Sequence, residues 1–586
     1  MPRANEAWTT ITLNPLVGPL DTRSRPAEVT AGGYRWKQNL GVSPDAKLSR
    51  RAGHARFWSD ATSYTNYDYH HQGRTPREPV TFQFESTSSD GTRRYLLGTQ
   101  SSVSVLNPTT GLYTDLVLSK GAAGSVWKAA ELKDHIIFTN DVDPPWAYRY
   151  NEDAPLMVLD PIPDLYLTLK VRKARVVVQY KGFIMLMNVE ENGERHANRI
   201  FWSDLNLPLD YDTSDDENLL SGFADLDPNE IILASGEMGG RLYIYTNRSI
   251  WWATTTGESI NVFVFVRAYT EPKNQTGCIA YENTLVSVGT EHWYMGREGI
   301  YRFNPYVPAP ICDDWLYRAA GVIYTDPTSK IDPAYCKSPV AEYVPERREL
   351  FISWPSEGQE GINNWTLAAQ VVLQTADVID HGYTSLVNFR RQATDTQGCN
   401  ETQELLGASG SDWCIKSIGN VFYREQAVSI DQTTDIPDVA AYTKNGYTSI
   451  LRGMIPLGLM EREKTLRSVL LDHDTRVQTD PCIARLRIGN HRLLVDANST
   501  DTTCSPQWRT VGDDKSLECP DSQTIAEMTA KNLRPDNATV WACYDQGRFL
   551  WFELSILNAD GTPAIGGDSA FHRIEFEVQG APKPAP

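Results

Sequence analysis

Short β-hairpin patterns recur along this chain and restrict its fold more than any other feature does. Three of them are RVVVQYKGFIMLMNVEE (175–191), GRLYIYTNRSIWWATTTGE (240–258) and NTLVSVGTEHWYMGREGIYRFN (283–304). Each joins runs of β-branched and aromatic residues through a short polar or glycine-containing turn, which is typical of antiparallel hairpins. Helical periodicity is scarce, and PDSQTIAEMTAKNL (520–533) is the best candidate for a helix. The pattern therefore predicts a mainly β protein.

The hairpins form a loose series along the chain. Their first strands are predicted to begin near Arg94, His135, Phe183, Arg241, Thr284, Glu349 and Ser411. Successive starts lie roughly 40 to 65 residues apart, and a four-stranded propeller blade takes roughly 40 to 50 residues. The longer gaps indicate blades with insertions, such as SWPSEGQEGINNWT (353–366). We predict a β-propeller of about six or seven blades over residues 78–430. Stacked β-sandwiches are the alternative.

The segments on either side of the predicted propeller differ from it. Residues 1–77 are rich in Arg, Pro, Gly and polar groups, and they lack sustained apolar runs. They are expected to form an extended N-terminal arm that orders chiefly against neighbouring chains. Residues 431–586 are again rich in strand patterns, and RIEFEV places Ile574, Phe576 and Val578 on one face. A C-terminal β-sandwich domain is predicted there.

Charge and hydropathy exclude several classes of protein. The formal net charge is -19, which argues against a basic grip on nucleic acid. No apolar run approaches the roughly 20 residues that a membrane-spanning helix needs. The first residues, MPRANEAWTT, contain no apolar core of a signal peptide, so none is expected.

No motif in the sequence has the spacing of a catalytic, cofactor-binding or metal site. P-loop, G-x-S-x-G and H-E-x-x-H patterns are missing from the sequence. His70 and His71 are adjacent, so their side chains diverge and a structural or surface pair is the favoured interpretation. The acidic segments NDVDPP (140–145) and DLDPNE (225–230) have oxygen ligands for a hard cation, but local turn chemistry explains them better. We predict a protein that is not an enzyme.

The tetrapeptide Phe-Trp-Ser-Asp occurs twice, at 57–60 and at 201–204. It is interpreted as the end of a strand followed by a turn, in which Ser and Asp bond back to the backbone. The aromatic side chains would then fill a core or an interface between blades. Stacking of Trp58 or Trp202 against carbohydrate is the alternative.

Several segments, taken in order, resemble a family of bacteriophage tail proteins. The opening resembles that family's start at Pro19-Leu20-Asp21-Thr22, Pro26, Asn39 and Arg51-Ala52-Gly53, with Pro19 where Gly is usual. The later segments that resemble it are FWSDLNLPLDYD (201–212), RLYIYTNRSIWWATTTG (241–257), GCIAYENTLVSVGTEHWYMGREGIYRFN (277–304) and GMIPLGLMEREKTLRSVLLD (453–472). The best-matching members are tail nozzle proteins of short-tailed phages, also called the second tail tubular protein. The resemblance does not separate the nozzle from related tail hub or stabilisation proteins.

The resemblance implies a structural virion protein that is assembled in the host cytoplasm. Nozzle subunits form a homo-oligomeric ring, usually a hexamer, below the adaptor and portal. The ring surrounds the DNA exit channel and serves DNA retention and ejection. Expected partners are the adaptor, the tail fibres and genomic DNA that passes without sequence-specific binding, with contact to the host surface also open. No cofactor is implied.

Two other classes of function remain open from the sequence. One is a propeller module that binds a receptor, a fibre or a glycan. The other is a propeller enzyme that degrades polysaccharide, because the 74 acidic residues could supply a facing carboxylate pair. For a nozzle, the net charge predicts an acidic channel wall, along which a duplex slides without being held.

Overall fold

The structure is a computed structural model of the 586-residue chain. It describes residues 9–13, 18–23, 33–42, 48–50, 54–56, 80–87, 93–106, 113–117, 121–122, 125–149, 159–161, 171–212, 220–258, 261–271, 277–304, 307–311, 314–345, 347–391, 402–408, 414–417, 446–447, 449–455, 464–475, 482–489, 509–510, 515–517, 537–547, 550–558, 564–565 and 569–580.

Strands dominate the described residues, and seven antiparallel four-stranded units follow one another along the middle of the chain. The first three are β6 (Val80–Thr87), β7 (Arg93–Thr99), β8 (Val103–Leu106) and β9 (Tyr113–Val117); β10 (Lys128–Leu132), β11 (His135–Thr139), β12 (Trp146–Arg149) and β13 (Leu159–Pro161); β14 (Val171–Tyr180), β15 (Phe183–Glu191), β16 (Glu194–Trp202) and β17 (Gly222–Asp225). The next two are β18 (Ile232–Met238), β19 (Arg241–Thr246), β20 (Ser249–Thr255) and β21 (Phe263–Thr270); β22 (Val286–Val288), β23 (Glu291–Met295), β24 (Ile300–Asn304) and β25 (Val307–Ile311). The last two are β26 (Val340–Val344), β27 (Glu349–Trp354), β28 (Trp365–Gln370) and β29 (Thr375–Ile379); β30 (Ser385–Arg391), β31 (Thr402–Ala408), β32 (Cys414–Ser417) and β5 (His54–Arg56).

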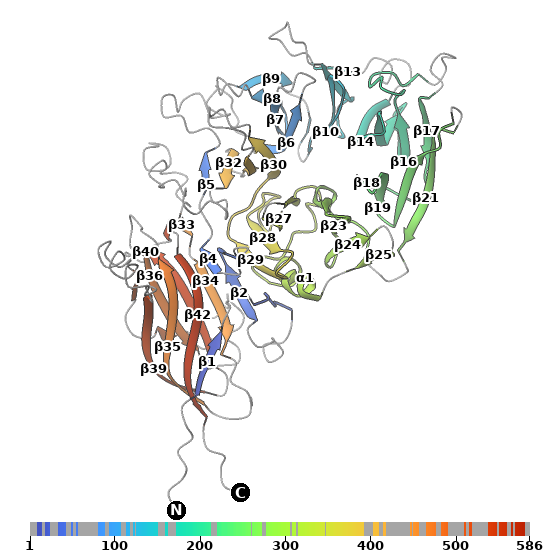
Figure 1. The fold of residues 1–586 in the computed structure, drawn as a ribbon. Coiled ribbons are helices and arrows are strands. Elements are labelled where there is room, and N and C mark those ends of the chain that lie inside the picture. Colours follow the sequence, from blue (N-terminus) through green and yellow to red (C-terminus); the bar gives the residue numbers. More distant parts are fainter. Residues whose placement is uncertain are drawn as a thin grey trace, which may run out of the picture.

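The seven units are arranged as a closed ring. The first strand of each unit contacts the first strand of the next, in the order β6, β10, β14, β18, β22, β26 and β30, and β30 contacts β6 again. Figure 1 shows the units distributed around a common centre. Apolar layers fill the spaces between neighbouring units; one contains Tyr180 and Phe183 against Phe263. The predicted mainly β fold is confirmed, and its arrangement is propeller-like.

The sequence hairpins are confirmed where the chain is described. The Lys181-Gly182 turn joins β14 to β15 with φ of 50° and 84°, the left-handed conformation that a two-residue hairpin turn requires. Thr246 to Ser249 joins β19 to β20. The loop predicted at 353–366 connects β27 to β28. Two short helices, α1 (Asp314–Ala319) and α2 (Gly321–Tyr324), and the 3₁₀ turn η4 (Glu282–Thr284) lie in connections between units.

The C-terminal part is a sandwich of two sheets. One sheet contains β35 (Lys464–Thr475), β39 (Asn537–Gly547), β42 (Ser569–Gly580) and arm strands β1 (Thr9–Leu13), β3 (Leu40–Val42) and β4 (Leu48–Arg50). The other contains β34 (Ser449–Met454), β40 (Trp551–Asn558), β36 (Cys482–Gly489), β37 (Arg509–Thr510) and β38 (Lys515–Leu517). A small pair, β33 (Gly446–Tyr447) with β41 (Ala564–Ile565), lies beside them. Phe552 and Phe576 meet between the sheets with ring centroids 5.2 Å apart, and Ile574, Phe576 and Val578 are all buried.

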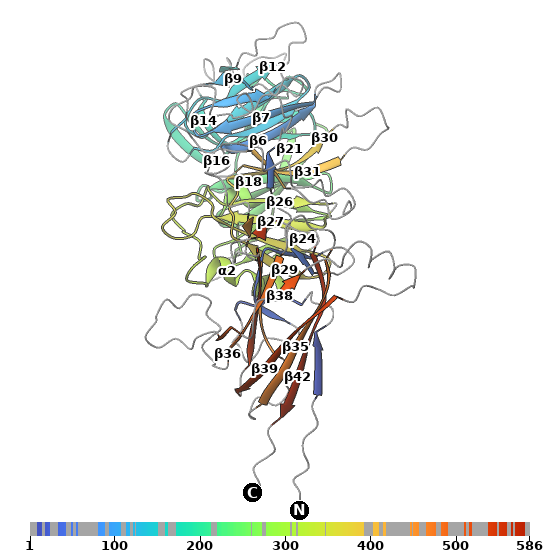
Figure 2. The ribbon, with the colours of Figure 1, turned by 90° about the vertical axis from the view of Figure 1, so that its left-hand side faces the viewer.

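One arm strand makes the ring and the sandwich a continuous sheet. Strand β2 (Tyr34–Gln38) lies between β29 of the sixth unit and β34 of the sandwich, which gives the order β26-β27-β28-β29-β2-β34-β40-β36-β37. Figure 2 shows the sandwich strands β35, β39 and β42 below the ring, with β1 beside β42. The two parts are therefore joined by backbone hydrogen bonds through the N-terminal arm.

The arm makes its partners within its own chain. Strand β1 pairs with β42, β2 with β34, and β5 with β32, where it completes the seventh unit. We expected residues 1–77 to order chiefly through neighbouring chains, and this is wrong for the described arm strands. Open edges of β42, β34 and β32 present backbone donors and acceptors, and a short strand satisfies them without a large apolar core of its own.

Several sequence predictions lie outside the described residues. These are the first Phe-Trp-Ser-Asp copy with Trp58, the His70-His71 pair, Pro26, Arg51-Ala52-Gly53 and the helix at 520–533. Among the residues that are described, no helix is long and apolar enough to cross a membrane.

Candidate functional site

A network of ion pairs spans the interior of the ring. Glu282, in η4 before the fifth unit, accepts a hydrogen bond from Arg175 Nε of β14 at 2.7 Å and lies 3.6 Å from Lys128 Nζ of β10. The second and fifth units are not neighbours in the ring. A contact between Lys128 and Glu282 must therefore cross the centre of the ring. We call this cluster, which comprises Lys128, Arg175 and Glu282 together with Asp141, Arg195 and Lys337, the axial ion network.

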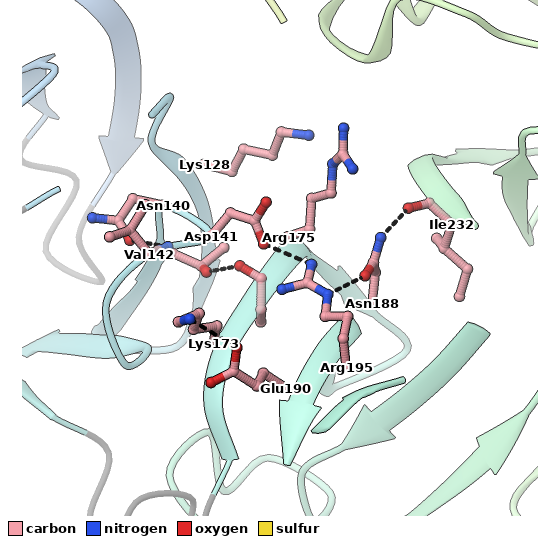
Figure 3. Close-up of polar contacts among 12 residues, drawn as sticks. Lys128, Asn140, Asp141, Val142, Lys173, Arg175, Asn188, Glu190, Arg195 and Ile232 are labelled. Carbon is pink, nitrogen blue, oxygen red and sulfur yellow. Dashed lines mark hydrogen bonds and ion pairs between the residues drawn. The ribbon is translucent and has the colours of Figure 1, made fainter. Parts of the chain in front are cut away.

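A second carboxylate extends the axial ion network. Asp141, in the turn between β11 and β12, lies 2.6 Å from Arg195 of β16 and 3.2 Å from Lys337 Nζ, which precedes β26. Arg195 Nε also donates to Asn188 Oδ1, and Asn188 Nδ2 donates to the Ile232 carbonyl of β18. Figure 3 shows this chain of contacts from Asp141 through Arg195 to Ile232. The network therefore connects the second, third, fourth, fifth and sixth units.

Topology explains why these groups meet. In each four-stranded unit, the turn between the second and third strands points to the same side of the ring as the connection into the next unit. Asp141 and Arg195 lie at turns of the first kind, whereas Glu282 and Lys337 lie in connections of the second kind. The axial ion network therefore lies at one mouth of the ring.

The ion pairs fix the charge state of the network. Burial acts to raise the pKa of Glu282, but Lys128, Arg175 and Lys337 outweigh it and hold that pKa below its ordinary value. Burial also acts to raise the pKa of Asp141, but Arg195 and Lys337 outweigh it, so the pKa of Asp141 is lowered as well. Burial lowers the pKa of Lys128, and Glu282 acts in the opposite direction. Both carboxylates are therefore ionised at neutral pH.

The second Phe-Trp-Ser-Asp copy is the end of a strand and a turn. Phe201 and Trp202 end β16 and are buried, and Trp202 Nε1 donates to the Leu220 carbonyl at 2.7 Å. Ser203 Oγ accepts from Ile184 N, and Asp204 Oδ1 accepts from Leu205 N. The structural interpretation is confirmed for this copy, since Trp202 is only 7% exposed and presents no open face to a sugar.

The two acidic segments are turns whose carboxylates have protein partners. Asn140 Oδ1 accepts from Val142 N and Asp143 N, which closes the first turn. In the second segment, Asp225 forms a two-point pair with Arg199, with both N–O distances 2.7 Å.

The other acids of the second segment are also paired. Asp227 contacts Arg267, and buried Glu230 accepts from Ser249 Oγ and Trp251 Nε1 at 2.7 Å each. Among the described residues, no group of His, Cys, Asp and Glu side chains has the arrangement of a metal site. The turn interpretation is confirmed for residues 140–143 and 227–230, whereas Asp225 is the last residue of β17.

The described residues near the start of the chain, among them Asp21, Thr22 and Asn39, lie at the junction of arm, ring and sandwich. Asp21 Oδ2 lies 3.1 Å from Arg318 NH1, and Thr22 Oγ1 donates to the Arg318 carbonyl at the end of α1. A Cβ on Gly321 would lie 2.2 Å from Thr22 Oγ1, so only glycine fits there. Asn39, with φ of 54°, donates its backbone N–H to Val378 O at 2.8 Å and its Nδ2 to Asp380 at 3.0 Å.

The axial ion network was missed in the sequence, apart from the turn that contains Asp141. Its members lie far apart along the chain, from Lys128 to Lys337, and no local spacing relates them. The available signal was the polar composition of first strands such as KAAEL of β10, which differs from the apolar second strands. A polar first strand beside an apolar second strand indicates that the first strand faces the axis of the ring.

The fold and its contacts define a mainly β, propeller-like protein with a sandwich joined to the ring by an arm. No protein-family model matches the chain, and no curated protein matches it. Sqt1 from Saccharomyces cerevisiae is a similar solved structure, with 9% identity, a TM-score of 0.33, and coverage of 57% of this chain and 84% of Sqt1. YCF48 from Cyanidioschyzon merolae has 11% identity, a TM-score of 0.34, and coverage of 59% and 97%.

Proposed function

We propose that this chain is a structural subunit of a bacteriophage tail: a nozzle subunit whose homo-oligomeric ring surrounds the DNA exit channel below the adaptor and portal. The observation that carries the proposal is the position of the phage-like opening. Leu20, Asp21 and Asn39 are all buried where the arm joins the ring to the sandwich. Residues buried at this joint hold the ring and the sandwich together, as a conduit under load requires, and do not form a binding loop.

The axial ion network bears on the path of the DNA. Lys128, Arg175 and Glu282 cross the interior of the ring of sheets, and a duplex has no room where side chains bridge that interior. In the proposed assembly, the DNA therefore passes between subunits and not through the axis of one propeller-like domain. We further propose that the seven units are the blades of one propeller, closed by arm strand β5.

The proposed subunit performs no catalysis. The acidic turns that were candidates for chemistry are neutralised by Arg partners, such as Arg199 for Asp225 and Arg195 for Asp141. A hydrolytic carboxylate pair needs one acid whose pKa is raised, whereas the pKa values of Asp141 and Asp225 are lowered. Hydrolysis of host-envelope polysaccharide that is abolished by a single carboxylate substitution would contradict this part of the proposal.

A mass measurement tests the proposed function. The purified chain is measured by native mass spectrometry over a range of concentrations, alone and with the adaptor protein of the same particle. The proposal predicts a discrete closed oligomer of the 65.8 kDa chain, about six copies as the family resemblance implies. A single-chain mass under all conditions, with binding to a receptor or glycan, would favour the monomeric binding module.

A further inference from the structure

The axial ion network has more positive than negative charge. Lys128, Arg175, Arg195 and Lys337 provide four cations, and Glu282 and Asp141 provide two carboxylates. The nearby Lys173 and Glu190 pair with each other at 2.7 Å and add no net charge. Two positive charges therefore remain without a counter-charge within this cluster, in a chain whose overall charge is -19.

Glu282 is the most deeply buried charged group of the axial ion network. The Glu282 side chain is only 4% exposed, whereas Asp141 is 18% exposed, Lys128 and Arg175 are each 19% exposed, and Lys337 is 31% exposed. The Glu282 carboxylate, which Lys128 and Arg175 share, is thus the most buried charge of the cluster, and the cations remain accessible to solvent. An approaching anion would meet the N–H donors of Lys128 and Arg175 before it meets the Glu282 carboxylate.

The geometry holds like charges together. Figure 3 shows the Lys128 ammonium and the Arg175 guanidinium extending from neighbouring strands toward the same point. Lys337 pairs with Asp141, and its charge lowers the pKa of Lys128, of Glu282 and of Asp141, so it belongs to the same cluster. Cations held this close repel one another unless negative charge is present, and an added anion relieves that repulsion.

We propose that this mouth of the ring binds a small oxyanion of the phosphate class. Arginine and lysine donors that converge from several elements suit the several acceptor oxygens of such a group. A dianion also matches the two unbalanced positive charges of the cluster. The site is a point and not a stripe, and the acidic character of the whole chain opposes a long polyanion. The inference is independent of whether the chain forms a ring of subunits.

Calorimetric titration of inorganic phosphate into the full-length protein tests the site, with chloride used to keep the ionic strength constant. Lys337→Met and Arg195→Gln each remove one cation and are expected to weaken phosphate binding roughly tenfold or more. Lys330→Met is the matched control, because Lys330 lies in the same connection as Lys337 but pairs with the exposed Glu357. This control is expected to bind phosphate as the unchanged protein does.

A third variant separates binding from structural damage. Glu282→Gln removes the internal counter-charge, so it is expected to tighten phosphate binding, whereas a variant that merely loosens the site would weaken it. The proposal is overturned if phosphate gives no heat beyond that of chloride, if Lys330→Met weakens binding as Lys337→Met does, or if Glu282→Gln weakens it.

Competition identifies the size of the ligand. A short duplex DNA added at the same phosphate concentration is expected to leave the binding of free phosphate unchanged, because its backbone brings many charges to an acidic surface. Displacement of phosphate by the duplex would contradict a site for a small ion. A small phosphate monoester is expected to compete with phosphate, and its failure to do so would also count against the proposed class.

Discussion

Gln38 of the N-terminal arm and Val378 of β29 lie opposite each other in a parallel pairing that makes the ring and the sandwich one sheet. The next residue, Asn39, bonds to the Val378 carbonyl, and both Gln38 and Asn39 donate to the Asp380 carboxylate. A segment near the start of the chain thereby fixes the position of the ring relative to the sandwich.

Substitutions of Asn39 are expected to loosen the joint to different degrees. Asn39→Ala loses the amide bonds and keeps an L-residue at positive φ, so we expect roughly 2–3 kcal/mol of local destabilisation. Asn39→Gly loses the same bonds but relieves the backbone, so roughly 1 kcal/mol is expected. Hydrogen exchange of β2 and β29 amides measures both. Equal protection in the two variants would show that the backbone conformation contributes nothing.

Trp202 is expected to act through packing. Trp202→Ala should destabilise the protein by roughly 3–5 kcal/mol, because it leaves a cavity between the third and fourth units and removes the bond to the Leu220 carbonyl. Trp202→Phe keeps most of the contact with Phe263 and should cost less than half as much. Urea denaturation measures the difference. Unchanged stability in Trp202→Ala, with loss of glycan binding, would support the carbohydrate interpretation instead.

Arg452 and Glu553 form a buried ion pair in the sandwich and are expected to be strongly coupled. Their side chains are 8% and 3% exposed, with Arg452 Nε 3.0 Å from Glu553 Oε2, and Arg487 also reaches Glu553 at 3.3 Å. Glu553→Leu alone should cost roughly 3–5 kcal/mol, because the buried Arg452 then loses the Glu553 carboxylate. The double variant Arg452→Met/Glu553→Leu should cost less than Glu553→Leu alone. Simple additivity in a double-mutant cycle would contradict this coupling.

His292 is expected to make stability depend on pH. The His292 imidazole is fully buried between the fourth and fifth units and is hydrogen-bonded to Tyr245 OH at 2.8 Å. Burial lowers the pKa of His292 from 6.5 to about 4. Between about pH 6.5 and pH 4 the unfolded chain binds a proton that the folded chain does not. The free energy of unfolding therefore has its full value with respect to His292 above about pH 6.5, and it falls by up to roughly 3 kcal/mol toward pH 4.

The variant His292→Gln isolates this contribution. It keeps a polar side chain for Tyr245 but does not titrate, so its stability should fall less than that of the unchanged protein across the same interval. Unfolding free energies measured at intervals from pH 7 to pH 4 give the comparison. Parallel curves for the two proteins would mean that His292 does not carry the predicted dependence.

Much of the ring could be predicted from the sequence, but mostly with an offset of one strand. The predicted first strands near Arg94, His135, Phe183, Arg241 and Glu349 coincide with β7, β11, β15, β19 and β27, each the second strand of its unit. Thr284 instead precedes the first strand β22, and Ser411 lies outside the described residues. Second strands are covered on both faces and are strongly apolar, as in HIIFT of β11. First strands face the axis and carry charges such as Lys128 and Arg175, so the apolar pattern alone does not predict them.

The long-range closures could not be predicted in this way. Strand β5 is only His54–Arg56, and its pairing with β32 depends on an open edge far along the chain. The Glu282 pairs likewise depend on the ring being closed, because only then do separate units share an interior. Local propensity and hydrophobic period contain no information of this kind.

The position of this chain in an assembled phage particle tests the central claim most directly. Electron cryo-microscopy of intact particles, with the ring and sandwich fitted as one body, would locate the subunits. The account predicts a closed ring of copies below the adaptor, around a DNA channel that runs between subunits and is lined by more Asp and Glu than Lys and Arg. Particles that lack this chain in the tail, or that carry it as single copies at the fibre tips, would contradict the account.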